Sequence, residues 1–234
     1  MNRIKEAAPK TSENGEKAKA PEPKKVAISI EAPKLATIPF RVIGTSPYVQ
    51  HRFGPKVARM MRDKQEKGRT NVRGKRNLDP KDFKGLFEDA QYRSVEGWNG
   101  IPATSFRAAM IGACRLINLT MEMGKRIFWI EADGYDPHEM IPLIRFSKVA
   151  KGNPRMFEQA LPNTNGGHDI RVRPMWEAGW ESIVRITFDQ DLYTATDIGN
   201  LLLRAGLQCG IGEGRNASKK CAGCGWGAFE LVKT

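Results

Sequence analysis

A glycine-rich stretch near the carboxyl end carries residue types suited to binding an anion. It runs from Gly206 to Phe229 with the sequence GLQCGIGEGRNASKKCAGCGWGAF. Glycine tolerates positive φ and lets a ligand approach the main chain closely, and oriented backbone amides can hold phosphate groups. No Gly-Lys-Ser/Thr follows, so this is not a nucleotide P-loop, and a tight structural connection is the alternative interpretation. The residues that we expect to contact a polyanion here are Gly210, Gly212, Gly214, Arg215, Lys219 and Lys220.

The same glycine-rich stretch carries three cysteines, Cys209, Cys221 and Cys224. Three thiolates could bind zinc, with a fourth ligand from a distant side chain. Candidates for that ligand are His51, His138, His168 and Cys114. Because only one Cys-x-x-Cys pair is present, we expect free cysteines and no metal or other cofactor.

His51 is the candidate for a catalytic residue, because histidine titrates near neutral pH and can act as a general base. It has no identifiable partner in the sequence, and there is no Ser-His-Asp order, HExxH or paired-carboxylate motif. A binding contact is therefore expected in preference to catalysis.

Composition limits the classes of ligand. The chain has 234 residues, a formal net charge of +12 and a hydrophobic content of 40%. This excess of positive charge favours an acidic partner, either nucleic acid or an anionic membrane surface. The sequence contains no run of about 18 apolar residues and no apolar signal core, which disfavours the membrane. Its four cysteines do not form a disulfide scaffold, so we expect a soluble, cytoplasmic protein in a reducing setting.

The charge pattern predicts a tail and one folded domain. Residues 1–34 are rich in Lys, Glu, Ala and Pro, and we expect them to be disordered. Residues 35–234 form the domain, with a basic insertion over 51–100 and a loop and hairpin excursion over 150–180. The insertion is interpreted as a mobile arm that neutralises phosphates, or alternatively as a solvated surface loop. Its candidate contacts are Arg52, Lys56, Arg59, Arg62, Arg69, Arg73, Lys75 and Arg76.

Hydrophobic periodicity predicts the elements that position these residues. The expected order is strand, basic insertion, helix, strands, hairpin, helix and strand. At the hairpin we expect an exposed Trp176 to stack on bases beside Arg171 and Arg173. Thr104 or Ser105 should cap the first helix, with Arg107 off its apolar face. The expected ranges are a strand from 35, a helix from its cap at Thr104 or Ser105 to Ile117, strands over 125–132 and 141–149, a hairpin of 170–175 with 180–188, a helix over 193–207 capped by Thr194 or Thr196, and a strand over 226–232.

Three stretches in this order resemble the RAMP superfamily. IPFRVIGTSPYVQH resembles its first strand, and IPATSFRAAMIGACR resembles the start of its first helix, although Ala103 and Ala108 replace the usual glycines. GIGEGRNASKKCAGCGWGAFEL resembles its glycine-rich loop. The order of elements also fits an α+β, ferredoxin-like or RRM-like antiparallel sheet with two helices on one face.

The resemblance implies a CRISPR-associated, guide-RNA-binding backbone subunit. Such a protein holds single-stranded RNA largely independently of sequence, with copies of itself or other effector subunits as partners. The resemblance also implies RNA contacts for Ser105 and Arg107 at the helix start. It places no catalytic residue in this chain. Two alternatives stay open, a metal-independent endoribonuclease on the same fold and a single-stranded DNA-binding or annealing protein of a mobile element.

Overall fold

The computed structural model describes residues 31–66, 81–162, 167–218 and 223–232. Nearly all of the predicted tail lies outside these ranges, and the chain from Pro33 onward forms one compact unit. The described residues are α+β, as the sequence predicts. The elements are β1 (Leu35–Gly44), β2 (Tyr48–Val49), α1 (Pro55–Glu66), α2 (Phe83–Asp89), β3 (Gly100–Pro102), α3 (Ala103–Cys114), a 3₁₀ turn (Arg115–Ile117), α4 (Met121–Ile127), β4 (Phe128–Ile130), β5 (Gly134–Tyr135), β6 (Pro142–Lys148), β7 (Arg155–Pro162), β8 (His168–Trp176), β9 (Glu181–Asp189), α5 (Ala195–Arg204), a π-helical turn (Ala205–Cys209) and β10 (Phe229–Leu231).

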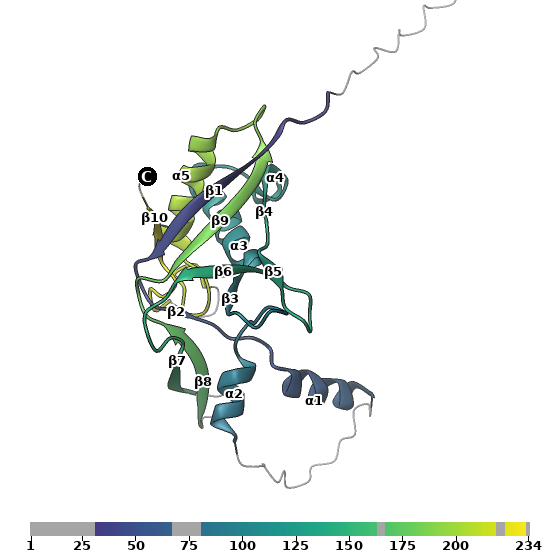
Figure 1. Cartoon of the computed structure of the whole chain (residues 1–234), viewed down its shortest axis with the longest axis vertical. Coiled ribbons are helices and arrows are strands. Elements are labelled where there is room, and N and C mark those ends of the chain that lie inside the picture. The colour runs from purple at the N-terminus through teal and green to yellow at the C-terminus, as the bar shows by residue number, and fades with distance from the viewer. Residues whose placement is uncertain (1–30, 67–80, 163–166, 219–222, 233–234) are drawn as a thin grey trace, which may run out of the picture. The chain divides into compact units, whose positions relative to one another are not determined.

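The larger sheet has the strand order β10-β1-β9-β6-β3, and every neighbouring pair is antiparallel (Figure 1). Its centre is the long pair of β1 and β9, in register from Leu35 opposite Asp189 to Ile43 opposite Glu181. The other edge of β9 pairs with β6 near its start and with β4 near its end. The strand beside β9 is therefore split into two pieces.

Helices α3 and α5 lie on the same face of this sheet and enclose the main core (Figure 1). Because side chains alternate across a strand, one set from β1 and β9 points toward these helices. Val42 and Val184 belong to that set and are fully buried. Phe106 and Met110 of α3 and Leu202 of α5 meet them with no exposed surface. Each such side chain contributes about 1.5 to 3 kcal/mol through burial.

Both predicted helices are present, with differences at their ends. Thr194 caps α5 in a capping box with Asp197, whose backbone N–H donates to the Thr194 hydroxyl at 3.2 Å. The predicted cap of α3 is wrong, because that helix starts earlier, after Pro102, and has no side-chain cap. Leu116 and Ile117, which fall in the last turn of the helix expected from hydrophobic periodicity, are exposed. The helix tightens into a 3₁₀ turn there, which moves them off the buried face.

The predicted hairpin of 170–175 with 180–188 is wrong. The two strands exist as β8 and β9, but they belong to different sheets. Strand β8 pairs instead with β7 and β2, from Arg155 opposite Met175 to Pro162 opposite His168. The stretch expected to be an irregular excursion therefore supplies strand β7. A four-residue connection between β8 and β9 carries the chain from one sheet to the other.

Two other segments also differ from expectation. The basic insertion contains helices α1 and α2, so its described parts are not an irregular arm, while residues 67–80 lie outside the described ranges. The strand expected over 125–132 is helix α4 followed by the short β4. The Thr120 hydroxyl accepts the Met123 N–H at 3.2 Å and caps that helix. Among the described residues, no helix has the length and apolar character needed to cross a bilayer.

Candidate nucleic-acid interface

The glycine-rich loop joins α5 to β10 and is held by its own backbone. The Ile211 N–H donates to Gly227 O at 3.0 Å, and the Glu213 N–H donates to Val49 O at 3.0 Å. Gly210, Gly212 and Gly214 have φ of +70°, +75° and +65°. A Cβ on Gly212 would lie 2.5 Å from Val49 O. The glycines therefore allow close packing of the loop. The Gly210 N–H also donates, to Ala205 O at 2.9 Å, so the amides of Gly210, Ile211 and Glu213 are all hydrogen-bonded within the protein.

A groove of about 1000 Å³ lies between this loop, α3 and the β7–β8 pair. Arg171 of β8, Arg115 after α3 and Arg215 of the loop line it. No described carboxylate forms an ion pair with any of these three guanidinium groups. The Arg215 Nη1 donates to Gly212 O at 2.8 Å, which holds that side chain against the loop. The groove therefore presents three guanidinium groups from separate elements, none of them in a direct ion pair with a described carboxylate.

A chain of charged side chains lies at one end of the groove. The Glu213 Oε2 is 2.5 Å from Nε of Arg173, and its Oε1 is 3.2 Å from Nδ1 of His51. Burial alone would raise the pKa of Glu213, but the His51 hydrogen bond and the Arg173 charge outweigh it and hold that pKa below its ordinary value. Because the ionised carboxylate can only accept, Nδ1 of His51 carries the proton. Burial lowers the pKa of Arg173, and Glu213 opposes that shift.

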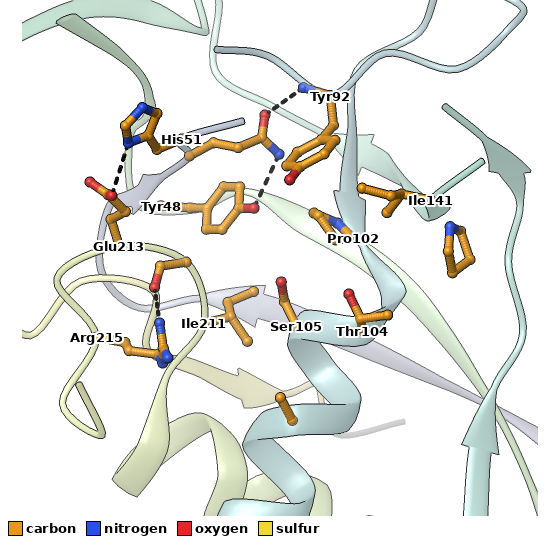
Figure 2. A pocket seen from close by; sticks show the side chains of 14 residues that line it. Tyr48, His51, Tyr92, Pro102, Thr104, Ser105, Ile141, Ile211, Glu213 and Arg215 are labelled. Atoms are coloured by element: carbon orange, nitrogen blue, oxygen red, sulfur yellow. Dashed lines mark hydrogen bonds and ion pairs between the residues drawn. The ribbon is translucent and has the colours of Figure 1, made fainter. Parts of the chain in front are cut away.

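A second hollow, of about 630 Å³, adjoins the groove (Figure 2). Ala108, Glu213 and Arg215 line both spaces. Its walls are mainly apolar or aromatic, and its polar groups come from β2, the segment after it and the first turn of α3. The remaining lining residues are Tyr48, Gln50, His51, Tyr92, Pro102, Thr104, Ser105, Ile141, Pro142, Ile211 and Gly212.

Most described candidate residues gather around these two spaces. His51, Ser105 and Gly212 line the hollow, while Arg171, Arg173, Gly210 and Gly214 line the groove, and Arg215 lines both. Arg107 does not, since its Nη2 donates to Lys125 O at 2.6 Å. Arg59 and Arg62 are exposed on α1 and line neither space. Outside the described residues lie Arg69, Arg73, Lys75, Arg76, Lys219, Lys220 and Cys221, and the side chain of Lys56 is likewise not described.

Two expected contacts need correction. Trp176 is 1% exposed and stacks on Phe146 with ring centroids 5.0 Å apart, so the prediction of an exposed stacking residue is wrong. It packs in the core because it is the last residue of β8, where the chain passes toward β9 of the main sheet. Arg52 is 7% exposed and donates to Asp136 Oδ2 at 3.0 Å. It is a buried structural ion pair and is not positioned to meet a phosphate.

The described residues contain no group of three His, Cys, Asp or Glu side chains that could hold a metal ion. Cys209 is buried, and burial raises the pKa of its thiol. Cys224 lies in the wall of the groove, and Cys221 is outside the described ranges. The described members of the candidate zinc set therefore do not form a group of three ligands.

Sequence reasoning missed several residues of the hollow. Tyr48, Gln50 and Tyr92 carry its hydrogen-bond network, and Glu213 joins it to the groove. Glu213 stood inside the glycine-rich stretch, where an acidic residue among basic ones was a usable signal. The others gave none, because residues 48 and 92 meet only through the fold.

The chain matches no protein-family model, and a search of curated proteins gives no match either. Its likeness to the RAMP superfamily therefore rests on the three sequence stretches themselves.

Proposed function

We propose that the protein binds single-stranded RNA in the groove between α3, the β7–β8 pair and the glycine-rich loop, largely independently of sequence. The observation that carries this proposal is the convergence of Arg115, Arg171 and Arg215 on one groove without a described carboxylate partner. Three such guanidinium groups suit a chain of phosphates and offer no pattern that reads base edges. The sequence-wide charge of +12 points to the same class of ligand.

The strand order supports assigning a ferredoxin-like arrangement. Taking β1, α3, β6, β9, α5 and β10 as the core gives the chain order βαββαβ. The first core strand, β1, then lies between the third, β9, and the fourth, β10. The second, β6, lies on the other side of β9. The three RAMP-like stretches fall on β1, on the start of α3 and on the α5–β10 loop. On this basis we propose a guide RNA as the ligand, and copies of the chain or other effector subunits as partners.

The open face of the sheet is a poorer candidate for the RNA site. An RRM places aromatic rings on this face to stack bases. Here Arg41 pairs with Glu181 at 2.5 Å, and Arg185 pairs with Asp133 at 2.6 Å. Lys148 also contacts Glu181, at 3.2 Å. Arg41, Arg185 and Lys148 are therefore paired with carboxylates of the protein, in contrast to the three arginines of the groove.

Binding of a labelled 12-residue oligouridylate at several salt concentrations tests the proposal. Three phosphate contacts give a slope of log K against log[salt] of about −2, or a loss of about 20-fold in affinity between 50 and 200 mM salt. Arg171→Ala should reduce the slope by about 0.7. The matched control is Arg126→Ala, which removes an arginine paired with Glu122 on the exposed side of α4. An affinity insensitive to salt, or equal effects of the two variants, would refute the groove.

Competition between RNA and DNA of equal length addresses the remaining alternative ligand. Preference for DNA would favour the single-stranded DNA-binding alternative.

The described cysteines Cys114, Cys209 and Cys224 are free thiols, which supports our assignment to a reducing cytoplasm.

The hydrogen bond between His51 and Glu213 favours one second candidate, a metal-independent endoribonuclease. With Nδ1 protonated and bonded to the carboxylate, the other nitrogen of a neutral His51 ring is left as a base. Labelled RNA incubated in EDTA should then give discrete products that His51→Ala abolishes. Intact RNA after prolonged incubation would eliminate this candidate and leave the binding function standing.

A further inference from the structure

The hollow beside the groove has an arrangement suited to a ligand of its own. Its volume of about 630 Å³ lies within the range of about 300 to 1,000 Å³ typical of small-molecule sites. Tyr92, Ile141 and Ile211 supply aromatic and aliphatic walls, while polar groups reach the hollow from the Tyr48–His51 segment, from the start of α3 and from the glycine-rich loop (Figure 2). It opens onto the groove at Glu213 and Arg215, which line both spaces.

One buried donor in this hollow has no acceptor among the residues that the structure describes. The Gln50 Oε1 accepts the Tyr92 N–H at 3.0 Å, so its Nε2 must face Gly100 O at 2.9 Å and the Tyr48 hydroxyl at 3.1 Å. Since Gln50 donates, the Tyr48 oxygen is the acceptor and its own proton points elsewhere. No described group accepts that proton. Tyr48 is 1% exposed, and burial raises the pKa of its phenol, so the unpaired donor persists at neutral pH.

The first turn of α3 adds more donors to the same space. This helix has no side-chain cap, so N–H groups of its first turn lack a side-chain partner. The hydroxyls of Thr104 and Ser105 point into the hollow on the side that faces the Tyr48 phenol (Figure 2). The site therefore offers donors to a ligand that must bring acceptors.

We propose that the hollow holds one unstacked base of the RNA while its phosphates follow the groove. This inference rests on the proposed function and adds a base-binding subsite to it. A base has a flat apolar surface for the Tyr92, Ile141 and Ile211 walls, and its carbonyl or ring-nitrogen acceptors suit the donors. A phosphate suits the site less well, because the ionised Glu213 lies at its mouth. RNA-binding proteins commonly read single strands by taking up such unstacked bases.

Titration of the full chain with uridine and adenosine monophosphates, followed by saturation-transfer NMR, tests this subsite. Ribose 5-phosphate is the matched probe, because it keeps the sugar and phosphate and lacks the base. We expect the nucleotides to bind at least tenfold more tightly than ribose 5-phosphate. Equal binding of the three probes would mean that the site recognises phosphate, and would overturn the proposal.

Variants of the two hydroxyl residues test the hollow itself. Tyr48→Phe keeps the ring and removes the unpaired donor, so nucleotide affinity should fall two- to tenfold. Ser105→Ala removes a more accessible hydroxyl and should act in the same direction, which covers the case that the Tyr48 variant misfolds. Arg126→Ala, at the exposed pair with Glu122 on α4, lies outside both the hollow and the groove and should leave mononucleotide affinity unchanged. Unaltered affinity in both hydroxyl variants would refute the subsite.

The two proposals fail in different ways. Salt-dependent binding of the 12-residue RNA without any binding of mononucleotides would refute the base subsite and leave the groove standing. Binding of mononucleotides without binding of the oligonucleotide would refute the proposed function and leave a nucleotide pocket.

Discussion

Replacing Arg52 with methionine should strongly destabilise the domain. Arg52 follows β2, beside His51, and its Nη2 contacts Asp136 Oδ2 at 3.0 Å. The same oxygen accepts the N–H groups of His138 and Glu139 at 3.0 and 2.9 Å. Asp136 is 1% exposed, so Arg52→Met would leave its charge buried without a cation. Because the pair joins the chain segment carrying His51 to the segment leading to Ile141, it also holds two walls of the hollow together.

The cost follows from burial. Removing one partner of a buried ion pair typically destabilises a protein by about 3 to 5 kcal/mol. For a domain of this size each kcal/mol lowers Tm by about 2 to 4 °C, so we expect a fall of about 6 to 20 °C. Asp136→Asn in the same chain would remove the orphaned charge and keep an acceptor for the two N–H groups. The double variant should therefore recover much of the loss.

Urea unfolding followed by circular dichroism measures both variants. The control is Arg126→Ala, whose pair with Glu122 is exposed, with side chains 74% and 76% accessible. Such exposed helical pairs contribute about 0.3 to 0.5 kcal/mol. A cost below 1 kcal/mol for Arg52→Met, or additive effects in the double variant, would refute the assignment of a buried structural pair.

Three further predictions concern the loop and α5. Gly212→Ala should lower stability by more than Gly179→Ala. Both glycines have positive φ, which costs an alanine about 1 to 2 kcal/mol, but only Gly212 also lacks room for a Cβ. Equal losses of stability in urea unfolding would contradict this. Glu213 has a depressed pKa, so its stabilisation is present above its ordinary value near 4.5 and is lost as pH falls through the folded pKa. In Glu213→Gln the free energy of unfolding should therefore depend less on pH in that window. An unchanged dependence of stability on pH would argue against the ion pair. Thr194→Ala should cost about 0.5 to 2 kcal/mol by removing the cap of α5, as measured by Tm.

The elements predicted most reliably were those with a local signal. Alternation predicted β1, and the apolar stripe with a capping threonine predicted α5. Strand partners were not predictable in this way, since alternation identifies a strand and is silent about its neighbour. The adjacency of 170–175 and 180–188 in the chain suggested a hairpin, whereas β8 pairs with β7.

The candidate site was predictable in part for the same reason. The glycine-rich loop and the arginines of β8 were found from composition and spacing. Their convergence depends on contacts between distant segments, such as His51 with Glu213, and no local pattern reports these. The loop's amides also turned out to be largely hydrogen-bonded within the protein, a consequence of close packing that glycine content alone does not distinguish from ligand binding.

Photocrosslinking tests the central claim most directly. A single-stranded RNA carrying 4-thiouridine, bound to the full chain and irradiated, can be located by mass spectrometry of the linked peptides. The groove predicts linked peptides from β8 and the glycine-rich loop, and the hollow predicts the peptide that contains Tyr92. Crosslinks confined to the open face of the sheet, at Trp129 or Ile183, would contradict the account.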